Sequence, residues 1–324
     1  MDFATIDPVP ALLDASFPMP LDEPFTTRQA DAAGISRRTL GRLTGEGLLR
    51  RLLRGVYVAA QARDGILLRA HGLALIAPAY AVICDWTACW LFTGLLPPNQ
   101  HLDVPPLAMF RHAGHNRLRN DLCKSGERTF APGDLIVIEG LTVTSPLRTA
   151  WDLGRLASRD NAIVALDGLL RHGSFSRDEL LAGVERFRRQ RGVVQLRQLA
   201  PLTDARAESP GESVLRLRWL DLPSLPPPTP QVPILGPDGR ELYRIDLGVE
   251  ELRFGAEYDG EAWHPLDDTS HDDERRETLR ERYMWTIKPV RRRNVFGVSR
   301  DVEAILYAGV REARAKMGRF RPAS

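Results

Sequence analysis

The sequence predicts an α+β protein of several domains, and three observations lead to this prediction. First, 324 residues with 43% hydrophobic content are more than one compact core usually holds. Second, helical and strand-like apolar patterns are mixed along the chain. Third, the proline-rich stretch at residues 222–233 must run extended, because each proline fixes φ and removes a hydrogen-bond donor. We expect three domains, over residues 1–60, 61–204 and 205–324.

Composition narrows the classes of protein. The formal net charge of +2 is nearly neutral, so affinity for nucleic acid must come from local clusters of arginine. Cys84, Cys89 and Cys123 lack metal-ligand spacing, which favours buried thiols in a reducing compartment. The chain starts with acids where a signal peptide is basic, and Pro78 and Asp85 divide the longest apolar run into two expected buried helices. We therefore expect a cytoplasmic protein that has no membrane span.

Residues 25–60 have the spacing of a winged helix-turn-helix. Thr27 is expected to cap a short helix, Gly34 breaks that helix, and Ser36 caps a second one. Two β-prone runs, "LLRRL" and "GVYVA", then predict the hairpin called a wing. Six arginines lie on the second helix and the hairpin: Arg37, Arg38, Arg42, Arg50, Arg51 and Arg54. A solvated helix face is the alternative, but the break, the cap and the basic wing agree on DNA binding.

The string "TLGRLTGEGLLRRLLRGVYV" resembles the recognition helix and wing of AbiEi-type antitoxins and related actinobacterial proteins. A later string, "GLTVTSPLRTAWDL", is similar to the central region of the same group. The resemblance implies a DNA-binding regulator that has a toxin or defence-system partner. It identifies no catalytic residue.

Residues 61–204 predict a mixed α/β connector. Apolar residues recur at helical spacing in four stretches, at residues 64–77, 81–94, 158–173 and 176–190. The string "LIVIEGLTVTSPLRTAWDLG" predicts two short strands and a helix that begins near Ser145. Ser145 and Asp152 form no nucleophile arrangement with a histidine, so we interpret them as capping and turn residues. The histidines of this region have no acidic or cysteine partner at a recognised metal spacing; they are His101, His112 and His115.

Carboxylates gather in the last third of the chain. Side chains alternate along a strand, so Glu257 and Asp259 share one face. Asp246 comes close to Glu257 if its strand pairs with theirs as a hairpin. Carboxylates held this close repel one another unless protons or a cation compensate, and oxygen ligands suit Mg²⁺. A solvated hairpin is the alternative, since Asp259 and Gly260 form an ordinary turn dipeptide.

A helix with Glu212, a strand with Asp246 and a strand with Glu257 follow the order of the PD-(D/E)XK nuclease superfamily. The string "AEYDGEAWH" resembles its very-short-patch-repair-like endonuclease branch, over about residues 205–298. The resemblance implies a restriction-endonuclease-like α/β domain that cleaves DNA with Mg²⁺. It also implies a metal site and a catalytic set; the metal ligands are Asp246, Glu257 and Asp259, and Glu212 and His264 complete the catalytic residues.

Within this resemblance, Glu212 is an auxiliary ligand or orients water, and His264 donates a proton or contacts phosphate. Asp259 departs from the pattern, because many members have lysine there. A carboxylate only accepts hydrogen bonds or binds a cation, so this departure weakens the inference of catalysis.

The end of the chain adds more arginine. Residues 272–285 predict an amphipathic helix, and "MWTIKPVRRRNVF" predicts a buried strand that ends in Arg291, Arg292 and Arg293. These arginines indicate contact with nucleic acid, while a solvated charged helix is the alternative. Two main functions stay open: a DNA-binding Mg²⁺-dependent endonuclease, and a non-catalytic regulator or antitoxin with a nuclease-like scaffold. Action on RNA is a third interpretation.

Overall fold

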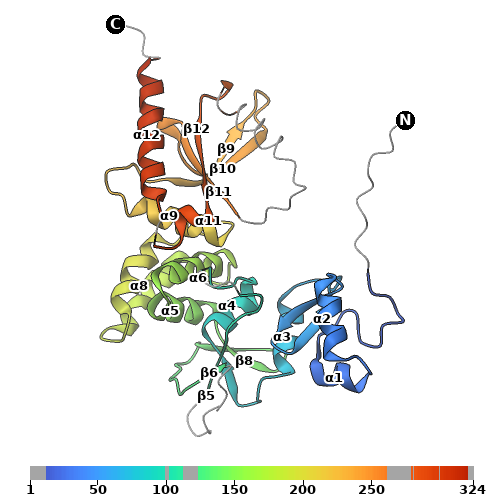
Figure 1. The fold of residues 1–324 in the computed structure, drawn as a ribbon. Helices are drawn as coiled ribbons and strands as arrows, with labels where there is room; N and C mark the ends of the chain where they lie inside the picture. The colour runs from blue at the N-terminus through green and yellow to red at the C-terminus, as the bar shows by residue number, and fades with distance from the viewer. Residues whose placement is uncertain are drawn as a thin grey trace, which may run out of the picture. The chain divides into compact units, whose positions relative to one another are not determined.

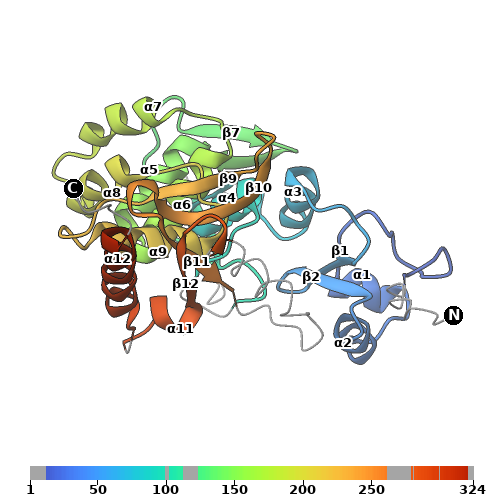
Figure 2. The same ribbon diagram turned by 90° about the horizontal axis from the view of Figure 1, so that it is seen from above.

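The computed structural model describes residues 12–98, 102–111, 123–260, 279, 281–298 and 300–319. The chain divides into two compact units, Met1–Leu153 and Gly154–Ser324. Figures 1 and 2 show helices and sheets in both units, as expected of an α+β chain. The finer division into three domains stays a prediction.

The first unit begins with a helix-turn-helix and a hairpin. Its elements are β1 (Phe25–Thr26), α1 (Thr27–Ala32), α2 (Arg37–Gly45), β2 (Leu49–Leu53) and β3 (Val56–Ala59), and the strands form one sheet in the order β1-β3-β2. Ser36 caps α2 as predicted, since its Oγ accepts a hydrogen bond from the Thr39 amide at 3.1 Å. The cap of α1 is Thr26 and not Thr27. The reason is a capping box, in which the Thr26 amide donates to Gln29 Oε1 at 2.8 Å and the Gln29 amide donates to Thr26 Oγ1 at 3.2 Å.

A five-stranded sheet completes the first unit. The helices and strands of this part of the chain are α3 (Ile66–Ala74), β4 (Ala81–Ile83), α4 (Asp85–Thr93), β5 (Leu107–Arg111), β6 (Cys123–Lys124), β7 (Leu135–Ile138), β8 (Leu141–Thr144) and α5 (Pro146–Leu156), whose last three residues belong to the second unit. The strand order is β6-β5-β4-β8-β7. Helix α4 packs on β5 and β8. The two strands and the helix predicted from "LIVIEGLTVTSPLRTAWDLG" are confirmed as β7, β8 and α5.

Two predictions for this region need correction. Residues 81–94 are not one helix, because Ala81–Ile83 form β4 and pair with β5 and β8 on either side. Val82 and Ile83 are β-branched and buried, so central strand pairing overrides the helical spacing of the stretch. Cys84 and Cys89 are buried as expected, but Cys123 is only half-buried, because it lies on β6 at the edge of the sheet. Burial raises the pKa of the Cys89 thiol to about 12.

The second unit combines a helical part with a four-stranded sheet. Its elements are α6 (Arg159–Arg171), α7 (Arg177–Ala182), η1 (Gly183–Phe187), α8 (Val193–Leu199), η2 (Ala200–Leu202), α9 (Pro210–Leu220), β9 (Thr229–Leu235), β10 (Glu241–Val249), η3 (Glu250–Leu252), β11 (Phe254–Asp259), β12 (Thr286–Arg291), α11 (Arg292–Val295) and α12 (Val302–Arg319). The sheet order is β12-β11-β10-β9, with β12 parallel to β11 and the other pairs antiparallel. The predicted helix with Glu212 and the predicted strands with Asp246 and Glu257 are confirmed as α9, β10 and β11.

Helices α9 and α12 hold this sheet from one side. The Trp219 ring of α9 lies 5.2 Å from the Phe254 ring of β11, measured between centroids. A Cβ on Gly309 of α12 would lie 2.3 Å from the same Phe254 ring, so only glycine allows this approach. Phe254 therefore packs between the two helices.

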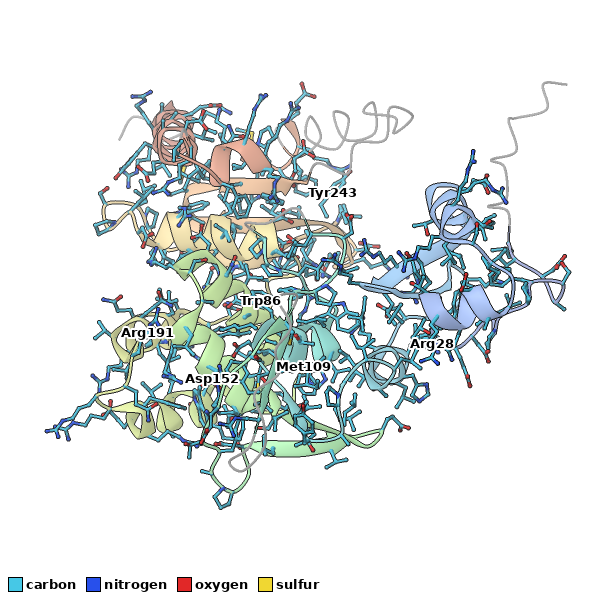
Figure 3. All side chains as sticks on the ribbon, turned by 60° about the horizontal axis from the view of Figure 1, so that its bottom comes forward. Arg28, Trp86, Met109, Asp152, Arg191 and Tyr243 are labelled. Carbon is cyan, nitrogen blue, oxygen red and sulfur yellow. The ribbon has the colours of Figure 1, made fainter. Side chains whose placement is uncertain are left out.

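Buried ion pairs tie distant segments together within each unit. In the first unit, Arg128 Nη1 lies 2.6 Å from Asp85 Oδ1 and 3.1 Å from Asp152 Oδ2. Arg148 Nε lies 2.9 Å from the same Asp152 oxygen and also pairs with Asp134. Asp152, labelled in Figure 3, is fully buried. Its interpretation as a capping or turn residue is therefore wrong, because it bridges two arginines inside the fold.

A substitution of Asp85 would measure how much this network of ion pairs contributes to stability. Burial by itself raises the pKa of Asp85, but Arg128 and Lys124 outweigh burial and hold that pKa below its ordinary value of 3.8. We expect Asp85→Asn to lower the free energy of unfolding by about 3 kcal/mol at neutral pH, since it leaves Arg128, whose side chain is only 12% exposed, with a weaker partner. Because the folded pKa is depressed, this contribution is present above the unfolded pKa and is lost as pH falls through the folded pKa.

Urea unfolding of both proteins over a pH series measures this effect. The exposed Asp31→Asn serves as the control and should change stability by no more than about 0.5 kcal/mol. A deficit in Asp85→Asn that stays constant well below pH 3.8 would contradict a role for the ionised carboxylate.

Candidate nucleic-acid interface and carboxylate cluster

Helix α2 is held by its apolar side and leaves its polar side exposed. Ile35, Leu40 and Leu43 are buried in the small core beneath the helix. The turn before it is tight, because Gly34 has φ +80° and the Ile35 amide donates to the Ala30 carbonyl at 2.8 Å. This geometry places the start of α2 on the surface, where a recognition helix contacts DNA.

The six predicted DNA-binding arginines fall into two groups. Arg42 is paired with Glu46 at 2.9 Å, and Arg50 donates to the Ala62 carbonyl at 2.9 Å and lies 3.6 Å from Asp64. The other four are exposed and form no ion pair with any residue in the described ranges; they are Arg37, Arg38, Arg51 and Arg54. This second group, which we call the free arginines, remains available to phosphate.

Two glycines on α2 were not singled out by sequence reasoning. Gly41 and Gly45 are exposed, and a Cβ at either position would meet no described atom within 4 Å. Glycine inside a helix costs about 1 kcal/mol relative to alanine, so packing does not explain its use here. The exposed backbone instead allows a close approach to a flat or grooved partner. The sequence feature that could have drawn attention to them is a pair of glycines four residues apart on a helix that also carries arginines.

The register of β10 and β11 brings Asp246 and Glu257 to one place. Leu247 pairs with Ala256, so the next positions outward are Asp246 and Glu257. The backbone ladder stops there, because the Tyr258 amide donates to Asp246 Oδ2 at 2.7 Å. Glu257 is buried and Asp246 is half-buried. The predicted hairpin pairing is therefore confirmed, while the role of these carboxylates stays a prediction.

Glu212 and Asp259 already have partners. Glu212 is buried on α9, and its Oε2 accepts from the Glu208 amide at 2.9 Å and from Gln231 Nε2 at 2.8 Å. Asp259 Oδ2 lies 3.6 Å from Arg291 Nε on β12. No group of three or more His, Cys, Asp or Glu side chains suited to a metal occurs among the residues that the structure describes. His264 lies outside those residues.

The N-terminus of α9 packs directly on β11. A Cβ on Gly211 would lie 2.0 Å from the Tyr258 ring, so this glycine lets the ring lie against the first turn of the helix. Tyr258 thus faces α9. The contact brings the helix that carries Glu212 alongside the strand that carries Glu257.

The three adjacent arginines do not form one patch. Arg291 ends β12 and pairs with Asp259, whereas Arg292 and Arg293 begin α11. The guanidinium of Arg292 lies 4.9 Å from the centre of the Phe296 ring. The predicted strand is confirmed up to Arg291. Most of the amphipathic helix predicted at residues 272–285 lies outside the described residues.

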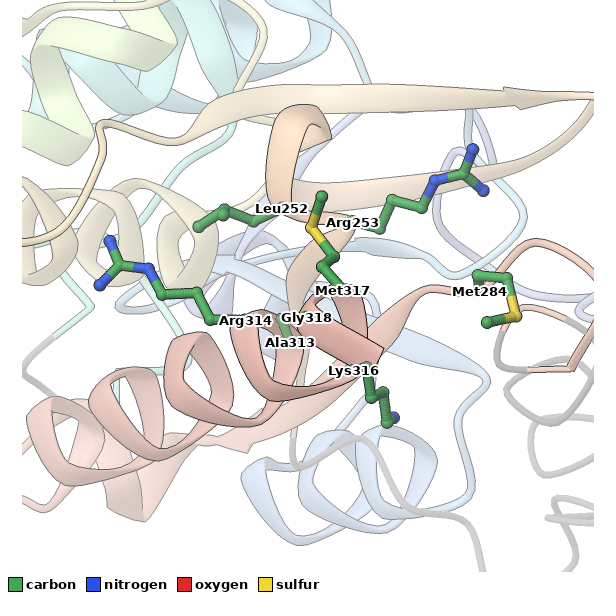
Figure 4. Close-up of a pocket in the computed structure, with 8 residues that line it drawn as sticks. All are labelled: Leu252, Arg253, Met284, Ala313, Arg314, Lys316, Met317 and Gly318. Carbon is green, nitrogen blue, oxygen red and sulfur yellow. The ribbon is translucent and has the colours of Figure 1, made fainter. Parts of the chain in front are cut away.

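An apolar pocket of about 750 Å³ lies at the other end of this sheet, by the turn between β10 and β11 (Figure 4). Its apolar lining includes Leu252, Met284 and Met317, and Arg253 stands beside them. Arg253 donates to the Tyr283 carbonyl at 2.6 Å and so joins two loops. The pocket contains none of the carboxylates discussed above.

Comparison with known proteins places the chain in a family. Residues 22–60 match the family described as "Transcriptional regulator, AbiEi antitoxin". Uncharacterized proteins from two strains of Mycobacterium tuberculosis are 32% identical to the chain over 262 residues, which cover 79% of this chain and 90% of each relative. The chain belongs to the family of these mycobacterial proteins. Its family membership covers both units, whereas the match to the AbiEi regulators covers the helix-turn-helix and wing.

The comparisons therefore agree with the AbiEi resemblance of the N-terminal segment. The resemblance of residues 205–298 to endonucleases stays a prediction. Within the described ranges, the helices are too short or too polar to cross a membrane.

Gly41 offers a test that separates stability from binding. We expect Gly41→Ala to raise the free energy of unfolding by about 0.5–1 kcal/mol, because the new methyl group meets open space and alanine favours the helix. The same methyl group should weaken DNA binding if α2 approaches DNA through its backbone. Urea unfolding and fluorescence anisotropy measure the two effects.

Gly318→Ala on α12 is the matched control, since that position is also open and helical. It should leave DNA affinity unchanged. Equal DNA affinity of Gly41→Ala and the unaltered protein would show that α2 does not approach DNA at this position.

Proposed function

We propose that the protein is a DNA-binding transcriptional regulator of the antitoxin kind, which contacts DNA through α2 and the wing. One observation carries the proposal: the segment that matches the AbiEi regulators is the segment that holds the four free arginines. Its location would be the cytoplasm, where DNA is accessible. A toxin or another defence-system protein would be its partner.

The arrangement of the free arginines suits a winged helix on DNA. Arg37 and Arg38 lie in the first turn of α2, which is the part of a recognition helix that reaches base edges in the major groove. Arg51 lies on β2, and Arg54 lies in the turn of the wing, where each side chain can reach phosphate. Arg42 would have to leave Glu46 before it contacted DNA.

A Mg²⁺-dependent endonuclease is the second candidate, and the position of Asp246 across from Glu257 favours it. Magnesium is often held by one or two carboxylates together with water, so this pair has suitable chemistry. Bound there, the ion would supply positive charge to a phosphate and acidify water. The Tyr258 amide would orient the Asp246 carboxylate. Arg291 places a cation beside Asp259, the position where many superfamily members have lysine.

The proposed regulator function predicts which residues DNA binding requires. The double variant Arg37→Ala and Arg38→Ala should bind promoter DNA at least tenfold more weakly, since it loses charge-assisted contacts at the start of α2. If these contacts reach phosphate, the slope of log affinity against log salt should also fall by about 1 for each lost contact. Fluorescence anisotropy at several salt concentrations measures both quantities.

Arg240→Ala is the matched control, because the Arg240 side chain is 86% exposed and lies on the hairpin of the second unit. It removes one positive charge, where the double variant removes two, and should leave affinity unchanged. A loss of affinity per removed charge as large in the control as in the double variant would mean that binding is a general charge effect and would overturn the assignment of α2.

The endonuclease candidate makes a separate prediction. If it holds, calorimetry should detect Mg²⁺ or Mn²⁺ binding, and the protein should nick plasmid DNA. Asp246→Asn and Glu257→Gln should both abolish binding and nicking, and the asparagine still offers an acceptor to the Tyr258 amide. Glu251→Gln, at an exposed position in η3, is the control. Plasmid left intact by the unaltered protein with either metal would exclude this candidate.

A further inference from the structure

Strand β7 forms an unguarded edge of the five-stranded sheet. Its four residues read "LIVI", and it pairs with β8 on its inner side. The Val137 residue is 71% exposed, and the other three residues are half-buried. No strand within the described ranges pairs with its outer side. An edge of this kind offers a row of backbone N–H and C=O groups to another strand.

The other edge strands of the described sheets are short or carry charges or prolines. In the small sheet, β1 has two residues and β2 contains Arg50 and Arg51. In the second unit, β9 contains two prolines and β12 contains a lysine, a proline and an arginine. The far edge of the five-stranded sheet, β6, has two residues, one of them a lysine. These features prevent pairing between edges, and β7 has none of them.

Each of the two acids that flank β7 lies beside a basic side chain of the same unit. Asp134, just before the strand, is buried and pairs with Arg148. Glu139, just after it, is exposed, and its Oε2 lies 3.5 Å from Nε2 of His71 on α3. The four residues of the strand itself are apolar, so the strand has no charge of its own along its open side.

We propose that β7 pairs antiparallel with β7 of a second copy of this chain. A two-fold axis places β7 of one copy opposite β7 of the other, so the side chains of this strand must be able to pack against an identical set. A charged edge would meet like charge at this axis, whereas "LIVI" meets only apolar residues. The two five-stranded sheets would then continue into each other. The inference rests on the first unit and does not depend on DNA binding or on catalysis.

Molar mass in solution tests the proposal. Light scattering of the full chain across a hundredfold range of concentration should reach twice the 36.2 kDa of one chain. Val137→Lys places like charges across the axis and should raise the dissociation constant of the dimer at least tenfold. Hydrogen exchange gives a second readout, because the outer amides of β7 should exchange slowly in the unaltered protein and rapidly in the variant.

Val194→Lys is the matched control, since Val194 is 64% exposed on α8. It makes the same substitution at an exposed position of the other unit and should leave the dimer intact. The folded state of each variant is checked by urea unfolding. A mass of 36.2 kDa for the unaltered protein at every concentration overturns the proposal, and so does a Val137→Lys dimer as tight as that of the unaltered protein.

Discussion

The pairing of buried carboxylates with arginine is the interaction on which both units depend. Arg128 and Arg148 share Asp152 in the first unit, and Arg216 holds Asp167 at 2.8 Å between α9 and α6 in the second. A buried ion pair adds little net stability over an apolar pair, but removal of one partner leaves a charge without compensation. These pairs therefore fix which segments lie together more than they add free energy. They also determine which charged residues are left for function.

The same principle separates the two clusters that the sequence singled out. Around α2 the free arginines have no acidic partner in the described ranges, so their charge is directed outward. In the carboxylate cluster, Glu212 is held by an amide and Gln231, and Asp259 is offset by Arg291. We expected a cation there because carboxylates held close together repel one another. Hydrogen bonds to Glu212 and the guanidinium of Arg291 already compensate part of this negative charge. Fewer carboxylates therefore need a metal ion for charge compensation, and the argument for a metal site rests on Asp246 and Glu257.

Local signals predicted much of the fold. The spacing of Gly34 and Ser36 predicted the helix-turn-helix, and the strand pattern around Asp246 and Glu257 predicted the hairpin of β10 and β11. The pairing of Asp152 with Arg128 was not predictable in this way, because Arg128 is 24 positions away and pairing at that separation depends on the tertiary fold. β4 was missed for a related reason: three residues carry too little periodicity, and only neighbours on both sides make them a strand. Sequence patterns thus locate candidate site residues, whereas their partners decide whether their charge remains available.

The near balance of 44 basic and 42 acidic residues has a consequence for DNA recognition. With most buried charges paired internally, electrostatic attraction to DNA would come from a few arginines and not from the whole surface. Each phosphate contact contributes about 0.9 to the salt slope, so one copy with four free arginines would make a modest, salt-sensitive contact. Two linked copies would make the second contact intramolecular and raise the overall affinity without new residues. The open edge of β7 and the small basic surface are therefore compatible features of one protein, because the proposed association would compensate for the few DNA contacts that each winged helix could make.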